Sequence, residues 1–404
     1  MPEYGLLGHP LGHSVSPEIH NAFGYEYELF DTCPENLGDF VNLGLKGFNV
    51  TIPYKKAIME HLDEVDALAY EIGAVNTVVR RGDKLYGYNT DVLGMEYAIS
   101  KSGVDLKDKS VMILGTGGTS LTAQVVCKRN GAKKVTVVSR SGKVNYDNYK
   151  ECKDTQIIIN TTPVGMYPNI DDRLIDIDSF SCLEGGFDVI YNPLETDFVR
   201  SFKKGGLPCS NGLLMLVAQA KYARDIFLGS RGEDSLIDEV YDNLLKRFRN
   251  IVLIGMPGCG KSSIAYRLAT RYKRVLIDTD KLVEDGEDKT IPQIFDEVGE
   301  EGFRDIEARA IKGIAGYRGS IISCGGGVVV RDENIKNLKR NGVVIYIKRD
   351  LVKLSREGRP LSKSIGVEKL YSERKSLYES YADIIVENNS TLDEVVEKIE
   401  EKVL

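Results

Sequence analysis

The sequence predicts an α/β protein whose strands are mostly parallel and whose chain is divided into more than one domain. Short β-branched runs alternate with amphipathic helical stretches, an order typical of parallel strands joined by crossover helices. Two glycine-rich turns, near residues 115 and 255, each follow such a run and precede a helical pattern. The length of 404 residues exceeds what one ordinary core fills. We therefore expect two nucleotide-binding units, with strands in 111–115, 134–140, 156–162, 251–255, 320–324 and 343–348.

The composition excludes several classes of function. A formal net charge of -7 without a basic tail argues against nucleic-acid and acidic-membrane partners. No apolar run is long enough to span a bilayer, and the N-terminus lacks the charged and apolar regions of a signal peptide. The 7 cysteines form no C-x-x-C pair, which argues against a disulfide framework or a zinc knuckle. We therefore expect a cytoplasmic protein, with monomer and homodimer both left open.

The first glycine turn predicts a dinucleotide site. Residues 115–120 read G-T-G-G-T-S between a strand and a helix, close to G-x-G-x-x-G/A, so a pyrophosphate is expected at the helix N-terminus. A purely structural tight turn is the alternative. The next strand ends in Ser-Arg-Ser instead of an acidic residue, which favours the 2′-phosphate of NADP over NAD. A solvated arginine is the alternative there. The expected NADP contacts are Gly115, Gly117, Gly118, Thr119, Ser120, Ser139, Arg140 and Ser141.

Polar residues gather at several strand ends in the first hundred residues. Ser14 and Ser16 lie in a loop before a helix, where Ser16 alone would be explained as an N-cap preceding Pro17. Further on, N-V-T-x-P-x-K ends in Lys55, and G-x-N-T-D ends in Asp91. Doubly wound domains collect ligands at such strand ends. We therefore expect these segments to form one substrate pocket.

These segments resemble the shikimate dehydrogenase family, with S-x-S-P, N-V-T-x-P-x-K, G-A-x-N-T and G-x-N-T-D-x-x-G in the family's order. The resemblance continues through 160–166, 188–193 and 215–219 and covers roughly residues 3–248. It departs from the family in its G-T-G-G-T-S turn and in Ser-Arg-Ser at 139–141. The resemblance implies a two-domain fold with a Rossmann NADP domain and Lys55 and Asp91 as the catalytic pair. It also implies that the substrate is held by Ser14, Ser16, Thr51, Asn76, Asp91, Tyr191 and Gln219.

The chemistry of ketone reduction agrees with this pair. Hydride addition builds an alkoxide, which needs a nearby proton donor. A lysine ammonium supplies the proton, and an adjacent aspartate holds it in place and tunes its acidity. Without the resemblance, Lys55 and Asp91 would be interpreted as a surface ion pair of little consequence. Ser16, where threonine would favour quinate, favours shikimate, and quinate or a related cyclic acid stays the alternative substrate.

The second glycine turn predicts phosphoryl transfer. Residues 255–262 match G-x-x-x-x-G-K-[ST] between a strand and a helix, the context that the P-loop requires. Backbone N–H groups would cradle phosphates, Lys261 would reach the β- and γ-phosphates, and Ser262 would coordinate Mg²⁺. Cys259 is expected to be a small filler. The expected ATP contacts are Gly258, Cys259, Gly260, Lys261, Ser262 and Ser263.

Residues 249–404 resemble shikimate kinase through D-T-D at 278–280, F-R-D-I-E at 303–307, a Gly triplet, R-P-L and Arg374. The resemblance implies that Asp278 assists Mg²⁺ and that Asp280 binds the acceptor hydroxyl and takes its proton. Arg359, in a charged stretch that we expect to form a lid, would act on ATP. Arg356 is the competing candidate for that role. An ion pair with Glu307 on the same helix is the alternative for Arg304, and a solvated loop charge the one for Arg359. The acceptor carboxylate is expected to be clamped by Arg304, Arg374, Gly325, Gly326 and Gly327.

The sequence thus predicts one polypeptide with two successive activities, NADPH-dependent reduction of 3-dehydroshikimate and ATP-dependent phosphorylation of shikimate. The expected substrates are small molecules. A non-catalytic relic in one domain is the alternative, and it would predict a missing catalytic group. The adenine contacts are not defined by the motifs, and residues 388–390 are only a hypothesis for them. The expected domains are 1–100 completed by 208–248 for substrate, 101–207 for NADP, and 249–404 as a parallel P-loop kinase sandwich.

Overall fold

The computed structural model describes residues 2–12, 14–354 and 366–403. Arg359 and the predicted lid around it lie outside the described residues. Contacts divide the chain into two compact units, Met1–Tyr191 with Thr196–Leu244 and Asn192–Glu195 with Leu245–Leu404. The domain limits predicted from the sequence stay predictions. Within the described ranges, no helix is both long and apolar enough to cross a bilayer.

The first sheet of the N-terminal unit is mixed, with strand order β2-β1-β3-β5-β6-β4. β1, β2 and β3 are parallel, as the sequence predicts, but β5 runs antiparallel to both β3 and β6. The reason is the two-residue turn Gly82–Asp83, which joins β5 and β6 into a hairpin in place of a crossover helix. The strands are β1 Tyr4–Gly8, β2 Glu28–Asp31, β3 Gly47–Val50, β4 Glu64–Val65, β5 Thr77–Arg81 and β6 Lys84–Tyr88.

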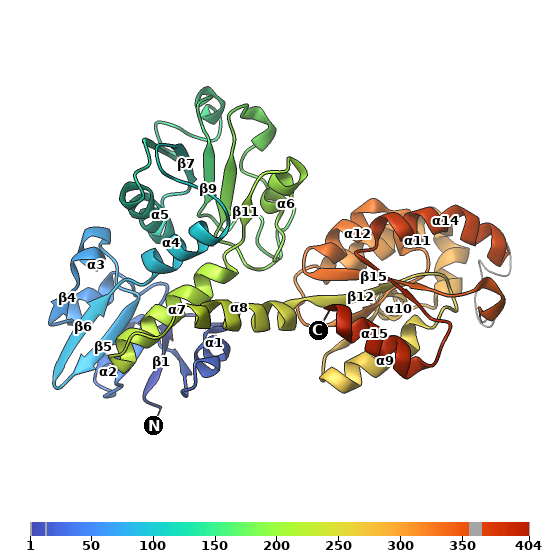
Figure 1. Ribbon diagram of the computed structural model, residues 1–404, viewed down its shortest axis with the longest axis horizontal. Helices are drawn as coiled ribbons and strands as arrows, with labels where there is room; N and C mark the ends of the chain where they lie inside the picture. The colour runs from blue at the N-terminus through green and yellow to red at the C-terminus, as the bar shows by residue number, and fades with distance from the viewer. Residues whose placement is uncertain (1, 13, 355–365, 404) are drawn as a thin grey trace. The chain divides into compact units, whose positions relative to one another are not determined.

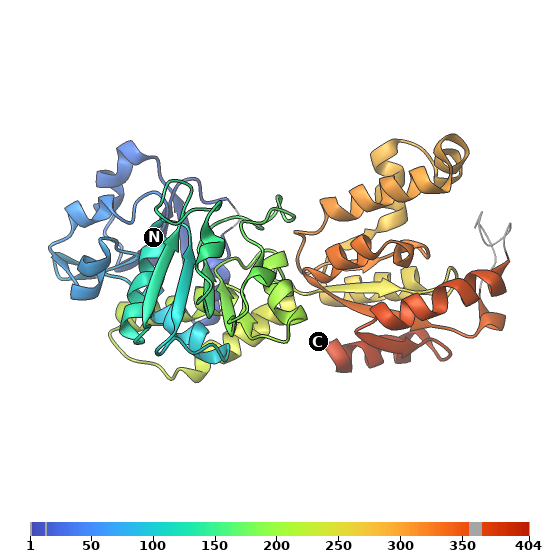
Figure 2. The ribbon, with the colours of Figure 1, turned by 90° about the horizontal axis from the view of Figure 1, so that it is seen from above.

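The second sheet is entirely parallel, with order β11-β10-β9-β7-β8. Its strands stand side by side in the view of Figure 2. All residues of β7 and β9 are buried, because helices and loops cover both faces of a parallel sheet. Three of the predicted strands appear here within one or two residues of their expected limits. The strands are β7 Ser110–Leu114, β8 Lys134–Val138, β9 Ile157–Asn160, β10 Gly185–Asp188 and β11 Cys209–Ser210.

Two helices, α4 and α7, lie between the two sheets of this unit and pack along each other (Figure 1). α4 begins at Asp91 and α7 carries Gln219, so the junction of the two sheets brings predicted site residues together. The helices are α1 Ser16–Ala22, α2 Leu37–Val41, α3 Ala67–Ile72, α4 Asp91–Lys101, α5 Gly118–Arg129, α6 Asp197–Lys204, α7 Leu213–Leu228 and α8 Ser235–Phe248.

The C-terminal unit holds a parallel five-stranded sheet with order β13-β14-β12-β15-β16. In Figure 1, α11, α12 and α14 lie over one face of this sheet and α9 and α15 over the other. The strands are β12 Asn250–Ile254, β13 Leu276–Asp278, β14 Ile321–Ser323, β15 Gly342–Lys348 and β16 Ile384–Glu387. The helices are α9 Lys261–Tyr272, α10 Thr279–Glu287, α11 Ile291–Gly313, α12 Asp332–Lys339, α14 Val367–Tyr381 and α15 Leu392–Val403.

The remaining elements are short 3-10 helices. They are η1 Pro34–Asn36, η2 Ala57–His61, η3 Tyr149–Glu151, η4 Ile177–Ser179, η5 Val328–Val330 and η6 Leu351–Lys353. The seven cysteines are free thiols, as expected from their spacing.

Candidate active sites

A cavity of about 550 Å³ opens in the N-terminal unit where the two sheets meet. The ends of β1 and β3, the start of α1, the N-terminus of α4 and the face of α7 all contribute side chains. Every residue predicted for the dehydrogenase substrate lines this cavity, although these residues are far apart in the chain. They are Ser14, Ser16, Thr51, Lys55, Asn76, Asp91, Tyr191 and Gln219.

Lys55 and Asp91 form an ion pair in this cavity, with Lys55 Nζ 2.5 Å from Asp91 Oδ2. Asn76 Nδ2 donates to the other carboxylate oxygen at 2.9 Å, and Gln219 Oε1 lies 3.4 Å from the same amide nitrogen. The Lys55 side chain is 30% exposed, whereas that of Asp91 is 16% exposed. The ammonium is thus held on one side by a partly buried carboxylate, while its other side stays open to a ligand.

The two predicted serines contact each other at the start of α1. Ser16 Oγ lies 3.2 Å from Ser14 Oγ, and Ser14 Oγ accepts from the backbone N–H of Ser16 at 3.3 Å. The alternative interpretation of Ser16 as the helix N-cap is wrong, because Val15 occupies the N-cap position and no side chain caps this helix. Both hydroxyls therefore remain directed to the cavity that they line.

Three further residues line this cavity that the sequence analysis did not assign to it. His20 and Asn49 line it, and so does Met215 on α7. Burial lowers the pKa of His20 to about 3, so this imidazole is neutral, and its ring stacks flat on Tyr27 at 3.9 Å between centroids. Asn49 lies inside the N-V-T-x-P-x-K motif and Met215 inside the 215–219 segment, so their positions beside other site residues were the available signal, whereas His20 lies outside these motifs.

The first glycine turn lies at the carboxyl end of β7. Gly115 has φ +104°, a conformation that favours glycine, and its N–H donates to Val138 O at 2.9 Å, which brings the ends of β7 and β8 together. A Cβ at Gly117 or Gly118 would meet no atom within 4 Å, so the start of α5 is open to a phosphate group. Ser120 is buried in the helix. The residues present fit a dinucleotide: Thr119 reaches the cavity, and 139–141 directly follow β8.

A second cavity, of about 280 Å³, opens in the C-terminal unit above the parallel sheet. Most residues predicted for the kinase line it, whereas Cys259, Gly260 and Ser263 do not. Sequence reasoning assigned no role in this cavity to Glu284, Phe295 and Phe303, which also line it. The predicted residues in the lining are Gly258, Lys261, Ser262, Asp278, Asp280, Arg304, Gly325, Gly326, Gly327 and Arg374.

The sequence left two interpretations open for Arg304, an ion pair with Glu307 and a place in the acceptor site, and its position is compatible with both. Its Nη1 donates to Glu307 Oε2 at 2.8 Å one turn along α11, and the guanidinium also lines the cavity. Both side chains are buried, and among the described residues Arg304 Nε has no hydrogen-bond partner. A Cβ at Gly327 would lie 2.2 Å from Arg304 Nη2, so only glycine lets the guanidinium approach. Arg374 Nη1 donates to Gly326 O at 3.0 Å beside it.

Asp280 has the electrostatics of a base. Burial raises its pKa to about 6, with further repulsion from Asp278 and Glu307, while Lys261 and Arg304 oppose the shift. Asp278 Oδ1 caps α10 by accepting from the Asp280 N–H at 3.0 Å. No cluster of three or more metal-ligating side chains occurs in the described part of the chain.

The P-loop is held by contacts within this unit. Lys261 Nζ donates to Gly255 O at 2.9 Å and to Met256 O at 3.1 Å, inside the loop that it serves. The Cys259 side chain is fully buried, consistent with the expected filler. Asn388 Nδ2 donates to Cys259 O at 2.6 Å, so the 388–390 region lies against the loop.

The fold and the two cavities define an α/β oxidoreductase with a dinucleotide-binding sheet, joined in one chain to a P-loop phosphotransferase. The shikimate dehydrogenase (NADP(+)) of Clostridium beijerinckii is 37% identical over 270 residues, which cover 62% of this chain and 100% of that protein. The chain belongs to the shikimate dehydrogenase family.

Family models and solved structures extend this comparison. A model of the shikimate dehydrogenase substrate binding domain matches residues 6–78, and a shikimate kinase model matches residues 257–404. The shikimate 5-dehydrogenase of Thermus thermophilus, solved with NADP(H) and shikimate, is 30% identical, with TM-score 0.54 and coverage of 60% of this chain and 99% of that chain. A chorismate mutase/shikimate 5-dehydrogenase fusion from Clostridium acetobutylicum is 35% identical, with TM-score 0.57 and coverage of 60% and 96%. A dehydrogenase and a kinase are thus combined in one polypeptide.

Proposed function

We propose that the N-terminal unit reduces 3-dehydroshikimate with NADPH and that the C-terminal unit phosphorylates the resulting shikimate with MgATP. The observation that carries the proposal is the Lys55–Asp91 pair at 2.5 Å inside a cavity lined by all the predicted substrate residues. The product of the first reaction is the acceptor of the second, so both cavities recognise the same cyclic hydroxy acid.

In the reduction, NADPH supplies a hydride when bound at the turn 115–120. Lys55 donates a proton to the carbonyl oxygen as it becomes an alkoxide, and Asp91 holds the ammonium in place. Asn76 keeps the carboxylate oriented through its bond to Oδ1. Ser14 and Ser16 bind the substrate carboxylate, and Gln219 and Thr51 bind ring hydroxyls. Ser139, Arg140 and Ser141 select NADP through its 2′-phosphate.

In the phosphorylation, Asp280 accepts the proton of the attacking hydroxyl. With a pKa of about 6 it is mostly ionised at neutral pH and still close to the operating pH, as an efficient base requires. Arg304 and Arg374 bind the carboxylate of shikimate, for which a planar guanidinium is suited. Lys261 stabilises the charge of the transferring phosphoryl group. Ser262 and Asp278 would hold Mg²⁺, which neutralises phosphate charge when bound.

Two alternatives are tested against this proposal. The first alternative is that the N-terminal unit acts on quinate, and a comparison of kcat/KM for the oxidation of shikimate and of quinate tests it. Ser16 supports shikimate. A non-catalytic relic predicts a missing group, yet Lys55, Asp91, Lys261 and Asp280 are all in place in their cavities. Free cysteines also support our proposal of a cytoplasmic location.

A coupled assay tests both activities on one protein. Purified chain receives 3-dehydroshikimate, NADPH and MgATP, and NADPH oxidation and ADP release are followed separately. We expect NADPH oxidation without ATP, ADP release with added shikimate, and shikimate 3-phosphate when all three are present. Absence of NADPH oxidation, or of shikimate-dependent ADP release, contradicts the corresponding half of the proposal.

A further inference from the structure

A buried carboxylate lies behind the dehydrogenase cavity and has no place in the mechanism above. Asp188 ends β10 and has no exposed surface. The next residue, Val189, lines the cavity, as does Tyr191. Any movement at Asp188 therefore moves a wall of the site that holds the ring of the substrate.

Three donors from three segments converge on this carboxylate. Asn160 Nδ2, at the end of β9, donates to Oδ1 at 3.0 Å, and the backbone N–H of Ile190 donates to the same oxygen at 3.1 Å. Thr196 Oγ1, at the start of α6, donates to Oδ2 at 2.6 Å. The backbone carbonyl of Asn160 also accepts from the Val189 N–H at 3.0 Å. The carboxylate thus joins the strand ends on both sides of the cavity wall.

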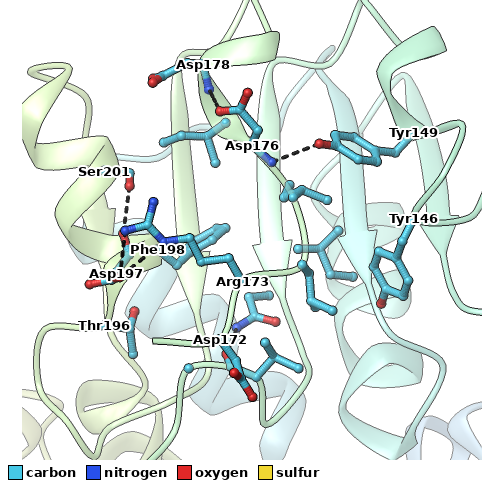
Figure 3. Close-up of a pocket in the computed structure, with 17 residues that line it drawn as sticks. Tyr146, Tyr149, Asp172, Arg173, Asp176, Asp178, Thr196, Asp197, Phe198 and Ser201 are labelled. Atoms are coloured by element: carbon cyan, nitrogen blue, oxygen red, sulfur yellow. Dashed lines mark hydrogen bonds and ion pairs between the residues drawn. The ribbon is translucent and has the colours of Figure 1, made fainter. Parts of the chain in front are cut away.

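Two of these donors border a separate cavity of about 400 Å³ on the same sheet. Figure 3 shows Thr196 in its wall, near the Arg173–Asp197 ion pair. Asn160 also lines it. Both donors are buried although they border this cavity, and each is joined to the end of β10 by its hydrogen bond to Asp188.

We propose that Asp188 is a positioning residue of the dehydrogenase site, whose carboxylate holds the Val189–Tyr191 wall by accepting hydrogen bonds from Asn160, Ile190 and Thr196. The proposal rests on the dehydrogenase function proposed above. An ionised carboxylate is a pure acceptor and suits three donors. Protonation turns one oxygen into a donor, so at least one of the three hydrogen bonds must weaken or reverse its direction. Thr196 Oγ1, which already accepts from the Val199 N–H at 3.2 Å, would have to accept a second hydrogen bond for the contact with Oδ2 to reverse.

The charge of this group changes near neutral pH. Burial raises the pKa of Asp188 to about 7, although the hydrogen bonds from Thr196, Ile190 and Asn160 oppose the shift. On the neighbouring strand β11, burial and the charge of Asp188 raise the pKa of the Cys209 thiol, with Lys203 of α6 opposing. Asp197 of α6 is neutralised by its ion pair with Arg173 at 2.7 Å. The carboxylate therefore accepts all three hydrogen bonds above about pH 7, and below it at least one of them weakens or reverses.

The test compares KM for 3-dehydroshikimate from pH 6 to pH 9 in the wild type and in Asp188→Asn. The wild-type KM should rise as the pH falls through about 7. Asp188→Asn should show a KM that does not change with pH and that is about tenfold above the wild type at pH 9, because one charge-assisted hydrogen bond is lost. A KM for Asp188→Asn equal to the wild type at pH 9, or one that keeps the wild-type pH dependence, overturns the proposal.

A second pair of variants keeps the test valid if Asp188→Asn does not fold. Thr196→Val removes the donor to Oδ2 and should move the KM transition to higher pH, whereas Thr196→Ser keeps the hydroxyl and should leave it in place. An unmoved transition in Thr196→Val contradicts the positioning role. If the wild type shows no NADPH oxidation at any pH, the proposed function fails instead, so the two failures are distinct.

Discussion

The guanidinium of Arg304 lies 2.8 Å from the carboxylate of Glu307, and both side chains are buried on the same face of α11. The hydrogen bond from Nη1 to Glu307 thus orients the guanidinium, while Nε has no hydrogen-bond partner among the described residues. A substrate carboxylate would meet a cation that is already oriented, which lowers the entropy lost on binding.

Gly327→Ala should raise the KM for shikimate in phosphorylation by roughly 10- to 100-fold. The added Cβ would lie 2.2 Å from Arg304 Nη2 and must displace the guanidinium. Steady-state ADP release measures the change. Gly286→Ala is the matched control, because its Cβ would meet nothing within 4 Å and its position is helical. Equal KM values for the two variants would contradict the role of Arg304.

Lys55→Ala should reduce NADPH oxidation by about 10²- to 10⁴-fold, because the alkoxide loses its proton donor. ADP release with shikimate should stay at the wild-type rate. Lys56→Ala removes the neighbouring exposed lysine and should leave both rates unchanged. A Lys55→Ala variant that oxidises NADPH normally would exclude this residue as the proton donor.

Lys261→Ala should have the opposite effect and reduce ADP release by about 100- to 1,000-fold, because charge on the transferring phosphoryl group is no longer neutralised. NADPH oxidation measured on the same sample serves as the internal control. Lys398→Ala, on the exposed side of α15, controls for loss of a positive charge. Loss of both activities in a folded Lys261→Ala protein would show that the two sites are not independent.

The rate of phosphorylation should fall about tenfold per pH unit below about 6, because Asp280 must be ionised to accept the hydroxyl proton. Glu307→Gln removes one of the negative charges that raise the pKa of Asp280, so it should move this transition to lower pH. The measurement is kcat for ADP release from pH 5 to pH 8. A transition that does not respond to Glu307→Gln would assign it to another group.

Asp280→Asn should stabilise the kinase unit at pH 8 while abolishing phosphorylation. Burial raises the pKa of Asp280 from 3.8 to about 6, so its favourable contribution, complete below about pH 4, is lost as the pH rises through 6. The neutral amide avoids that cost, which is about 3 kcal/mol. Thermal unfolding at pH 8 and pH 4 measures the difference, which should vanish at pH 4. A variant less stable than the wild type at pH 8 would contradict the expected sign.

Particular elements show how far the sequence predicted the fold. The strands at 111–115 and 251–255 appear within a residue of their predicted limits. The hairpin of β5 and β6 was missed, although the Gly82–Asp83 turn between two alternating runs was its signal. An N-cap role was the alternative for Ser16, but α1 begins one residue earlier than that role requires.

The sequence by itself determined which chemical groups this protein carries, because the glycine turns and the polar strand ends are local patterns that backbone geometry and phosphate chemistry require. It did not determine which of those groups meet. The 2.5 Å contact of Lys55 with Asp91, the burial that raises the pKa of Asp280, and the hydrogen bond from Asn160 to Asp188 all depend on segments far apart in the chain. Only tertiary structure decided them, because desolvation and hydrogen-bond distance are properties of packed neighbours and not of residue order.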